Sequence, residues 1–179
     1  MDFKDKIKGS TMLVILSMLY GNMSMSEREE ISHETLGKEH PSLISIYERE
    51  KPDIVICAGD FSDDAEELSY VFPENTYHIV KGNCDYYDMQ RSDEMILELG
   101  GHKVFLAHGH HYRVKLEYET IEKRGRELEC DIVIFGHTHR PYLEKKKGIT
   151  LFNPGAVLGN DYGIIKINKE SIDFLLKRI

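Results

Sequence analysis

Short apolar runs rich in isoleucine, valine and leucine recur along the chain, and most of them end at a glycine or a polar residue. Two of them, in Asp53–Ala58 and Asp131–Phe135, are continuous, which is typical of strands that are buried on both faces. The pattern predicts strands at Leu13–Ser17, Asp53–Ala58, Thr76–Val80, Asp93–Leu99, His102–Ala107 and Asp131–Phe135. Gly100-Gly101 separates the fourth strand from the fifth, which predicts a two-residue hairpin turn.

Polar and charged stretches lie between these runs and predict helices. The expected helices are Ser26–His33, Pro41–Glu50, Asp63–Val71 and Lys115–Glu129. Ser26 suits the N-cap of the first, because a glutamate follows three residues later. Pro52 ends the second, because the residue before a proline is disfavoured in helical geometry. Acidic residues in the first turn of the third complement the helix dipole.

After residue 140 the pattern changes to paired strands with short turns. Two hairpins are predicted, Pro141–Lys146 with Ile149–Phe152 and Tyr162–Asn168 with Ser171–Leu176. Alternating helices and strands followed by hairpins imply a mixed α/β fold. We expect the last third of the chain to supply a second sheet, since a plain doubly wound domain would not end in two consecutive hairpins.

Potential metal ligands gather where the predicted strands end. Asp60, Asn83, His108, His137 and His139 all follow apolar runs, most of them across a glycine. Ligands of open α/β sheets bind outside the carboxyl ends of strands, so we expect these side chains to converge. One carboxylate, one amide oxygen and three imidazoles suit transition metals better than Ca²⁺ or Mg²⁺. Each residue alone is also typical of a turn or a solvated loop, but together that interpretation requires several coincidences in order.

Five short motifs carry a family resemblance. They are Gly59-Asp60, Gly82-Asn83-Cys84-Asp85, His108-Gly109-His110, Gly136-His137-Thr138-His139 and Asn153-Pro154-Gly155. In this order they resemble the calcineurin-like metallophosphoesterase superfamily, and most of all its small single-domain phosphodiesterases of bacteria and archaea. The resemblance implies an α/β fold with two facing mixed β-sheets flanked by helices, in four layers αββα, and a binuclear metal centre at the strand ends.

The resemblance also implies roles for the ligands. Asp60 would bridge two metal ions, Asn83, His108 and His137 would complete one site, and His139 would belong to the other. Mn²⁺ is the expected ion, with Ni²⁺, Fe²⁺, Zn²⁺ and Co²⁺ as alternatives. The implied reaction is hydrolysis of a phosphoester, above all a phosphodiester, by metal-activated water.

Two further residues are candidates for catalytic roles. His110 would contact the phosphate or protonate the leaving group, and Asp85 would orient the neighbouring loops. The alternatives are a solvent-facing histidine and a turn residue.

The first motif departs from the family pattern. An aspartate and a histidine are expected after the first strand, but Met18 and Tyr20 stand in their places. A thioether is a poor ligand for hard divalent ions, and a phenol ligates less readily than imidazole at neutral pH. We therefore expect one intact site and one depleted site, holding one or two ions. The alternative is an inactive pseudo-enzyme that binds a protein partner, as a subunit of this fold does in the retromer coat.

Charge and composition narrow the remaining options. The chain has 179 residues and a net charge of −8, which argues against broad binding to nucleic acid backbones. Three cysteines without paired spacing fit the cytoplasm, and no run is long enough for a membrane span. We expect an N-terminal extension or tag remnant at residues 1–11 and one domain at residues 12–179. The substrate class is a small phosphoester, and a homo-oligomer is compatible with the sequence.

Overall fold

The computed structural model describes residues 11–16 and 41–179. The predicted helix Ser26–His33 and the substituted positions Met18 and Tyr20 lie outside these residues. Within them, Thr11 already pairs with Ile167, so the first strand begins one residue before the expected domain boundary.

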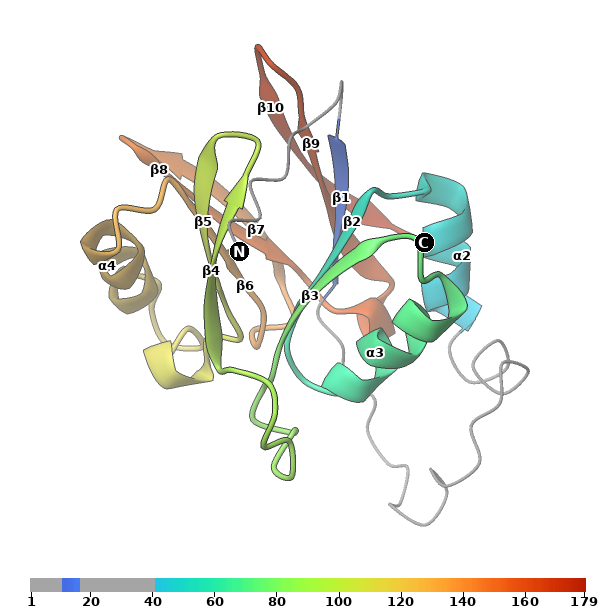
Figure 1. Cartoon of the computed structure of the whole chain (residues 1–179). Coiled ribbons are helices and arrows are strands. Elements are labelled where there is room, and N and C mark those ends of the chain that lie inside the picture. The colour runs from blue at the N-terminus through green and yellow to red at the C-terminus, as the bar shows by residue number, and fades with distance from the viewer. Residues whose placement is uncertain (1–10, 17–40) are drawn as a thin grey trace.

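Three neighbouring strands of the first sheet, β1, β2 and β3, run parallel, and an antiparallel hairpin joins them beside β1 (Figure 1). Its order is β10-β9-β1-β2-β3. The bounds are β1 Thr11–Leu16, β2 Ile54–Ala58, β3 Thr76–Val80, β9 Asp161–Ile167 and β10 Ile172–Arg178. Every residue of β2 is buried, as its continuous apolar run predicts for a central strand.

The second sheet has the order β4-β5-β6-β8-β7. Its strands are β4 Glu94–Leu99, β5 His102–Ala107, β6 Ile132–Phe135, β7 Pro141–Lys146 and β8 Ile149–Pro154. β4 and β5 form the predicted hairpin through Gly100-Gly101, whose φ angles of 61° and 85° suit glycine. β5, β6 and β8 are parallel, so their carboxyl ends share one edge.

The expectation that the last third of the chain supplies the second sheet is wrong. The β7–β8 hairpin does join β4, β5 and β6, but the β9–β10 hairpin returns to the first sheet. There β9 pairs antiparallel with β1, with Leu13 opposite Ile165. The return gives β1 a backbone hydrogen-bonding partner on each side, β2 and β9, and leaves β10 rather than β1 at the edge of the sheet.

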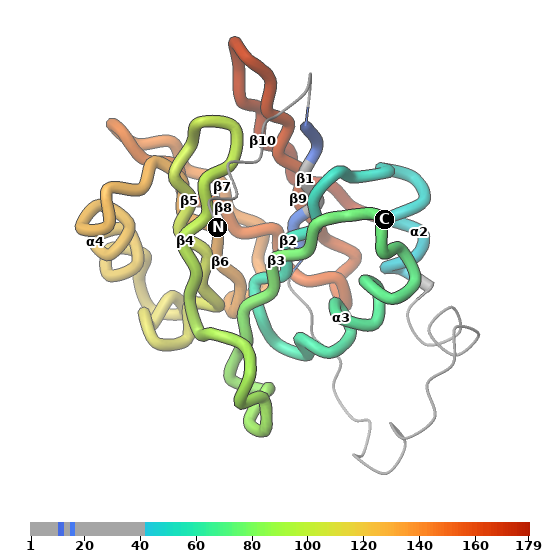
Figure 2. Tube along the Cα trace, in the orientation of Figure 1, coloured from blue at the N-terminus to red at the C-terminus, as the bar shows by residue number. Residues whose placement is uncertain are grey.

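Three α-helices of the described part of the chain cover the outer faces of the two sheets (Figures 1 and 2). They are α2 Pro41–Glu50, α3 Ser62–Val71 and α4 Glu119–Glu127. Leu43 and Ile46 of α2 and Leu68 of α3 pack with the first sheet, and Ile121 of α4 packs with the second. A third cluster, which includes Ile56 and Leu106, fills the space between the sheets. This four-layer αββα arrangement confirms the expected fold class.

The last predicted helix is shorter than its charge pattern indicates. A short 3-10 helix spans His110–Tyr112, and α4 begins only at Glu119 rather than at Lys115. Arg113 has a φ of 55°, which breaks helical geometry, and the buried Val114 packs against the backbone of Gly109. Lys115 therefore lies in a loop next to the His108 motif.

The cysteines behave as small core residues or exposed thiols. Cys57 and Cys130 are buried, as expected, and Cys84 is exposed. All three are free. Among the residues that the structure describes, no helix has both the length and the apolar character needed to cross a membrane.

Candidate metal centre

Both sheets contribute side chains to one cluster at their shared carboxyl edge. Asp60 follows β2, Asn83 follows β3, His108 follows β5 and His137 follows β6. The Nε2 atom of His108 lies 3.2 Å from Asp60 Oδ2, 3.2 Å from Asn83 Oδ1 and 3.1 Å from His137 Nδ1. The structure thus brings together four of the five predicted ligands.

The geometry of this cluster fits a cation. The Nδ1 atom of His108 lies 2.7 Å from the carbonyl oxygen of Ala58, which can only accept a hydrogen bond, so Nδ1 is the donor and carries the hydrogen. A proton on Nε2 could serve only one of its three neighbours, Asp60, Asn83 or His137, at a time. A divalent ion accepts lone pairs from all four side chains, and ligand atoms bonded at about 2.1 Å to one ion lie about 3 Å apart at right angles. The observed separations match that spacing.

The electrostatics of the cluster keep its ligands in binding form. Burial raises the pKa of Asp60, but His108 and the Cys84 N–H outweigh it, so the pKa lies below its usual value. That N–H donates to Asp60 Oδ1 at 2.9 Å. Burial and the charges of His108 and Lys115 lower the pKa of His137 to about 4. At neutral pH the cluster therefore offers a carboxylate and a neutral imidazole, the forms that bind metals.

His139 lies apart from this cluster. Its ligand atoms are outside the close group formed by Asp60, His108 and His137. Its buried Nε2 atom has no hydrogen-bond partner in the described part of the chain, and burial lowers its pKa. An unpaired buried nitrogen is costly, so this atom suits a ligand to a neighbouring position. Met18 and Tyr20, which would flank that position by resemblance, are outside the described residues.

The backbone around the ligands is strained. Asp60, Phe61, His137 and His139 have φ angles of 58°, 53°, 65° and 57°, in the left-handed region. Residues other than glycine pay about 1–2 kcal/mol there, and such strain clusters at functional sites. These turns therefore lower the stability of the fold in order to place the ligand side chains.

Two glycines allow the ligands to approach one another. A Cβ added at Gly82 would lie 2.3 Å from Asp60 Oδ1 and 2.4 Å from Asp60 N. A Cβ added at Gly59 would lie 2.8 Å from the Cβ of His108. Neither contact is tolerable, so glycine at both positions is a condition of the cluster.

Asp85 and Asn153 hold the ligand loops in place. The carboxylate of Asp85 accepts the N–H groups of Ser62 at 3.0 Å and Gly82 at 2.7 Å. Asn153 is fully buried and donates to the carbonyl of Gly136 at 2.8 Å. Sequence reasoning gave Asn153 no role of its own, although it opens the last of the five motifs.

His110 and Lys115 stand beside the cluster. The ring of His110 is centred 5.3 Å from that of His108 and 6.1 Å from that of His137. Burial, and then the charges of His111 and His108, lower its pKa, so it is neutral at neutral pH. Sequence reasoning missed Lys115, whose charge also lowers the pKa of His139. The sequence does show a lysine shortly after the His108 motif. Because this lysine was assigned to a surface helix, no role at the site was predicted for it.

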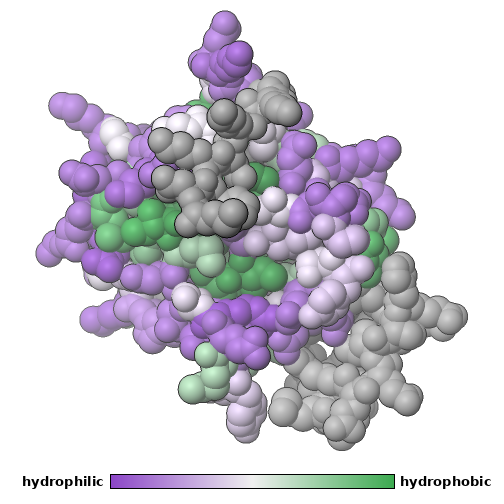
Figure 3. Space-filling model, in the orientation of Figure 1, coloured by the Kyte–Doolittle hydropathy of each residue, from purple (hydrophilic) through white to green (hydrophobic). Residues whose placement is uncertain are grey.

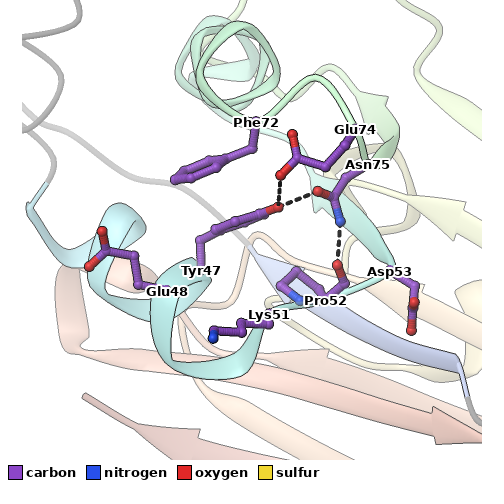
Figure 4. Close-up of a pocket in the computed structure, with 8 residues that line it drawn as sticks. All are labelled: Tyr47, Glu48, Lys51, Pro52, Asp53, Phe72, Glu74 and Asn75. Carbon is purple, nitrogen blue, oxygen red and sulfur yellow. Dashed lines mark hydrogen bonds between the residues drawn. The ribbon is translucent and has the colours of Figure 1, made fainter.

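A cavity of about 700 Å³ opens far from this cluster, at the amino ends of β2 and β3 (Figure 4). Tyr47 and Phe72 form its stacked aromatic wall, with ring centroids 3.6 Å apart. The Tyr47 hydroxyl donates to Glu74 at 3.1 Å, and Asn75 donates to the carbonyl of Pro52. These polar groups are thus engaged with one another, and none of the predicted site residues lines the cavity. The chemistry lies in the side-chain cluster rather than in this cavity.

Asp88 ties the loop after β3 to α3. It accepts the N–H groups of Gln90 and Arg91, both at 2.9 Å, and binds the Arg91 guanidinium at 2.6 Å. Burial alone raises the pKa of Asp88, but these donors lower it to about 2. The stabilisation is therefore complete above about pH 4 and is lost as the pH falls through 2.

We expect Asp88→Asn to lower the free energy of unfolding by roughly 2 kcal/mol at pH 7. Urea unfolding of both proteins at pH 7, 5, 4 and 3 checks this. The difference between them should shrink below pH 4, because the wild-type carboxylate is then increasingly protonated in the unfolded chain. A difference that stays constant down to pH 3 would show that charge is not the cause.

The chain is similar in sequence to known proteins. Residues 31–168 match the model of the calcineurin-like phosphoesterase superfamily domain. The chain is 31% identical over 125 residues to the probable metallophosphoesterase YsnB of Bacillus subtilis. The aligned region covers 69% of this chain and 66% of that relative. The match thus spans just under two thirds of the relative's length.

Solved structures share the fold. An archaeal phosphodiesterase has a TM-score of 0.58 and 21% identity, with coverage of 93% of this chain and 99% of that one. Vps29 of Entamoeba histolytica in complex with zinc has a TM-score of 0.65 and 17% identity, with coverage of 94% and 98%. At such identities the likeness shows the fold alone.

Proposed function

Because the chain belongs to the calcineurin-like phosphoesterase superfamily, we propose that it hydrolyses phosphodiesters with a divalent metal ion held by Asp60, Asn83, His108 and His137. The observation that carries this proposal is the convergence of three ligand atoms on the Nε2 atom of His108. An ion there supplies positive charge for the phosphoryl oxygens and acidifies water. The mixed nitrogen and oxygen donors suit Mn²⁺, Fe²⁺, Co²⁺, Ni²⁺ or Zn²⁺ better than Ca²⁺ or Mg²⁺, and among them we propose Mn²⁺ because of the resemblance to the family.

The neighbouring side chains position the substrate. His110, neutral and next to the cluster, donates a hydrogen bond from its ring to a phosphoryl oxygen. Lys115 attracts the anionic phosphoester to the edge of the sheet. Asp85 and Asn153 act through other groups, because they hold the loops of Gly82 and Gly136. We place this activity in the cytoplasm, where three free cysteines are kept reduced.

The function is tested with bis(p-nitrophenyl) phosphate, an activated phosphodiester. Protein stripped of metal with a chelator should be inactive, and Mn²⁺ should restore the release of p-nitrophenolate. Binding of Mn²⁺ without any turnover would instead favour a scaffold that has kept part of the site.

We expect Mn²⁺ saturation to leave one tightly bound ion per chain. The reason is that Met18 and Tyr20 replace two ligands of the position to which His139 belongs by resemblance. Elemental analysis after gel filtration of the Mn²⁺-saturated protein gives the number. Two retained ions per chain would contradict a mononuclear centre. If the wild-type protein retains one ion, the double variant Met18→Asp with Tyr20→His should retain two.

A scaffold that binds a protein partner is the second candidate function. The presence of Met18 and Tyr20 in place of two metal ligands favours it. In that case the described cluster would be structural, and a protein would bind at the edge of the sheets. Retention of all five other ligands favours the enzyme.

A further inference from the structure

The loop between β3 and β4 projects beyond the carboxyl edge of the sheets (Figures 1 and 2). We call residues 82–92 the tyrosine loop. In Figure 3 a part of the molecule stands out at the lower edge in the position of this loop. Three large side chains at its tip are almost fully exposed, Tyr86 at 81%, Tyr87 at 81% and Met89 at 88%. Single exposed apolar residues are ordinary, but three within four positions indicate a binding surface.

The base of the tyrosine loop is firmly held. Lys81 N–H donates to the carbonyl of Ser92 at 3.0 Å and closes the neck. Asp85 binds the N–H groups at its start, and Arg91 forms ion pairs with Asp88 and with Asp63 and Glu66 of α3. The tyrosines are thus presented from an ordered base, and this lowers the entropy lost when a ligand packs on them.

The tyrosine loop also carries a ligand of the metal cluster. Asn83 precedes Tyr86 by three residues, so their Cα atoms are at most about 11 Å apart. A phosphodiester held at the cluster has two organic groups, and one of them can extend over the tip of the loop. Tyr112, which follows the His108 motif, is engaged elsewhere, since it packs edge-on against Phe105.

We propose that Tyr86 and Tyr87 bind a planar organic group of the phosphodiester, such as a nucleobase, by stacking. This inference rests on the proposed function and names the class of its substrate. Aromatic rings stack on any base because every base has a π-face. The acidic residues of the loop and the net charge of −8 disfavour a polyphosphate. The substrate is therefore a diester with a single phosphate and a flat ring.

Two substrates with the same leaving group test the stacking. Thymidine 5′-(p-nitrophenyl phosphate) and methyl p-nitrophenyl phosphate both release p-nitrophenolate, so the ratio of their kcat/KM values isolates the base-bearing group. Tyr86→Ala with Tyr87→Ala should reduce the wild-type ratio by at least about fivefold, the lower end for the loss of one stacked base. Tyr86→Phe with Tyr87→Phe should keep it, because the rings remain.

Tyr70→Ala is the matched control, since Tyr70 is 72% exposed but lies on α3. It should leave the ratio unchanged. If the double alanine variant has the wild-type ratio, the inference is overturned. If light scattering then also shows that this variant has a different oligomeric state, the tyrosines belong to a contact between copies of the chain.

A binding measurement separates this inference from the proposed function. Calorimetry with thymidine 5′-monophosphate and Mn²⁺ needs no turnover. If the wild-type protein hydrolyses neither substrate, the proposed function fails. Weaker binding of the nucleotide by the double alanine variant still supports stacking in that case, and equal binding by both proteins overturns it.

Discussion

His108→Ala is expected to reduce the phosphodiesterase activity by at least about 100-fold and to abolish most of the metal affinity. Loss of a residue that only supports a ligand typically costs 10- to 100-fold, and His108 stands at the centre of the cluster itself. Its Nε2 faces Asp60, Asn83 and His137, so its removal leaves three ligands without their common neighbour. Hydrolysis of bis(p-nitrophenyl) phosphate and calorimetric titration with Mn²⁺ measure the two losses.

His102→Ala is the control for this prediction. His102 is the first residue of β5, the strand that His108 follows, and its Nδ1 contacts Asp131 at 2.6 Å. This variant should keep both activity and Mn²⁺ affinity. Full activity of His108→Ala would show that any hydrolysis takes place elsewhere on the molecule.

Gly82→Ala is expected to reduce activity by about 100-fold, although the residue carries no functional group. The added methyl would lie 2.3 Å from Asp60 Oδ1, so the carboxylate or the loop must shift, and a misplacement of about 1 Å can cost that much. Overpacking should also lower the free energy of unfolding by about 1–3 kcal/mol. Activity and urea unfolding are measured on the same preparation.

Gly159→Ala provides the comparison. A Cβ at Gly159 meets only Asp161 Oδ2 at 3.5 Å, an ordinary contact. Activity should be unchanged there. If Gly82→Ala binds Mn²⁺ and turns over like the wild type, the close approach of this backbone to Asp60 does not shape the site. A folded Gly82→Ala protein with weak Mn²⁺ binding is the expected result.

Local pattern was sufficient for most strands, because a buried strand needs a continuous apolar run and leaves that run in the sequence. His102–Ala107, whose last four residues are buried, has the predicted bounds. The fully buried β2 begins one residue after the predicted Asp53. The same pattern failed for α4. Its charged, helix-like sequence begins at Lys115, but the carbonyl of Arg113 accepts the N–H groups of Leu116 and Glu117 in a turn, and α4 begins only at Glu119. Helical spacing records a preference of the chain and contains no information about such a contact.

The sequence by itself determined the family, the ligand types and their places after the strands, because each of these is a property of a short segment. Only the tertiary structure decided which side chains meet. It set His139 apart from the other four and brought Lys115 to the site. It also returned the β9–β10 hairpin to β1. The physical reason is that these contacts join segments far apart in the chain. Several strand pairings and side-chain contacts are compatible with the local sequence, and the packing of both sheets selects among them.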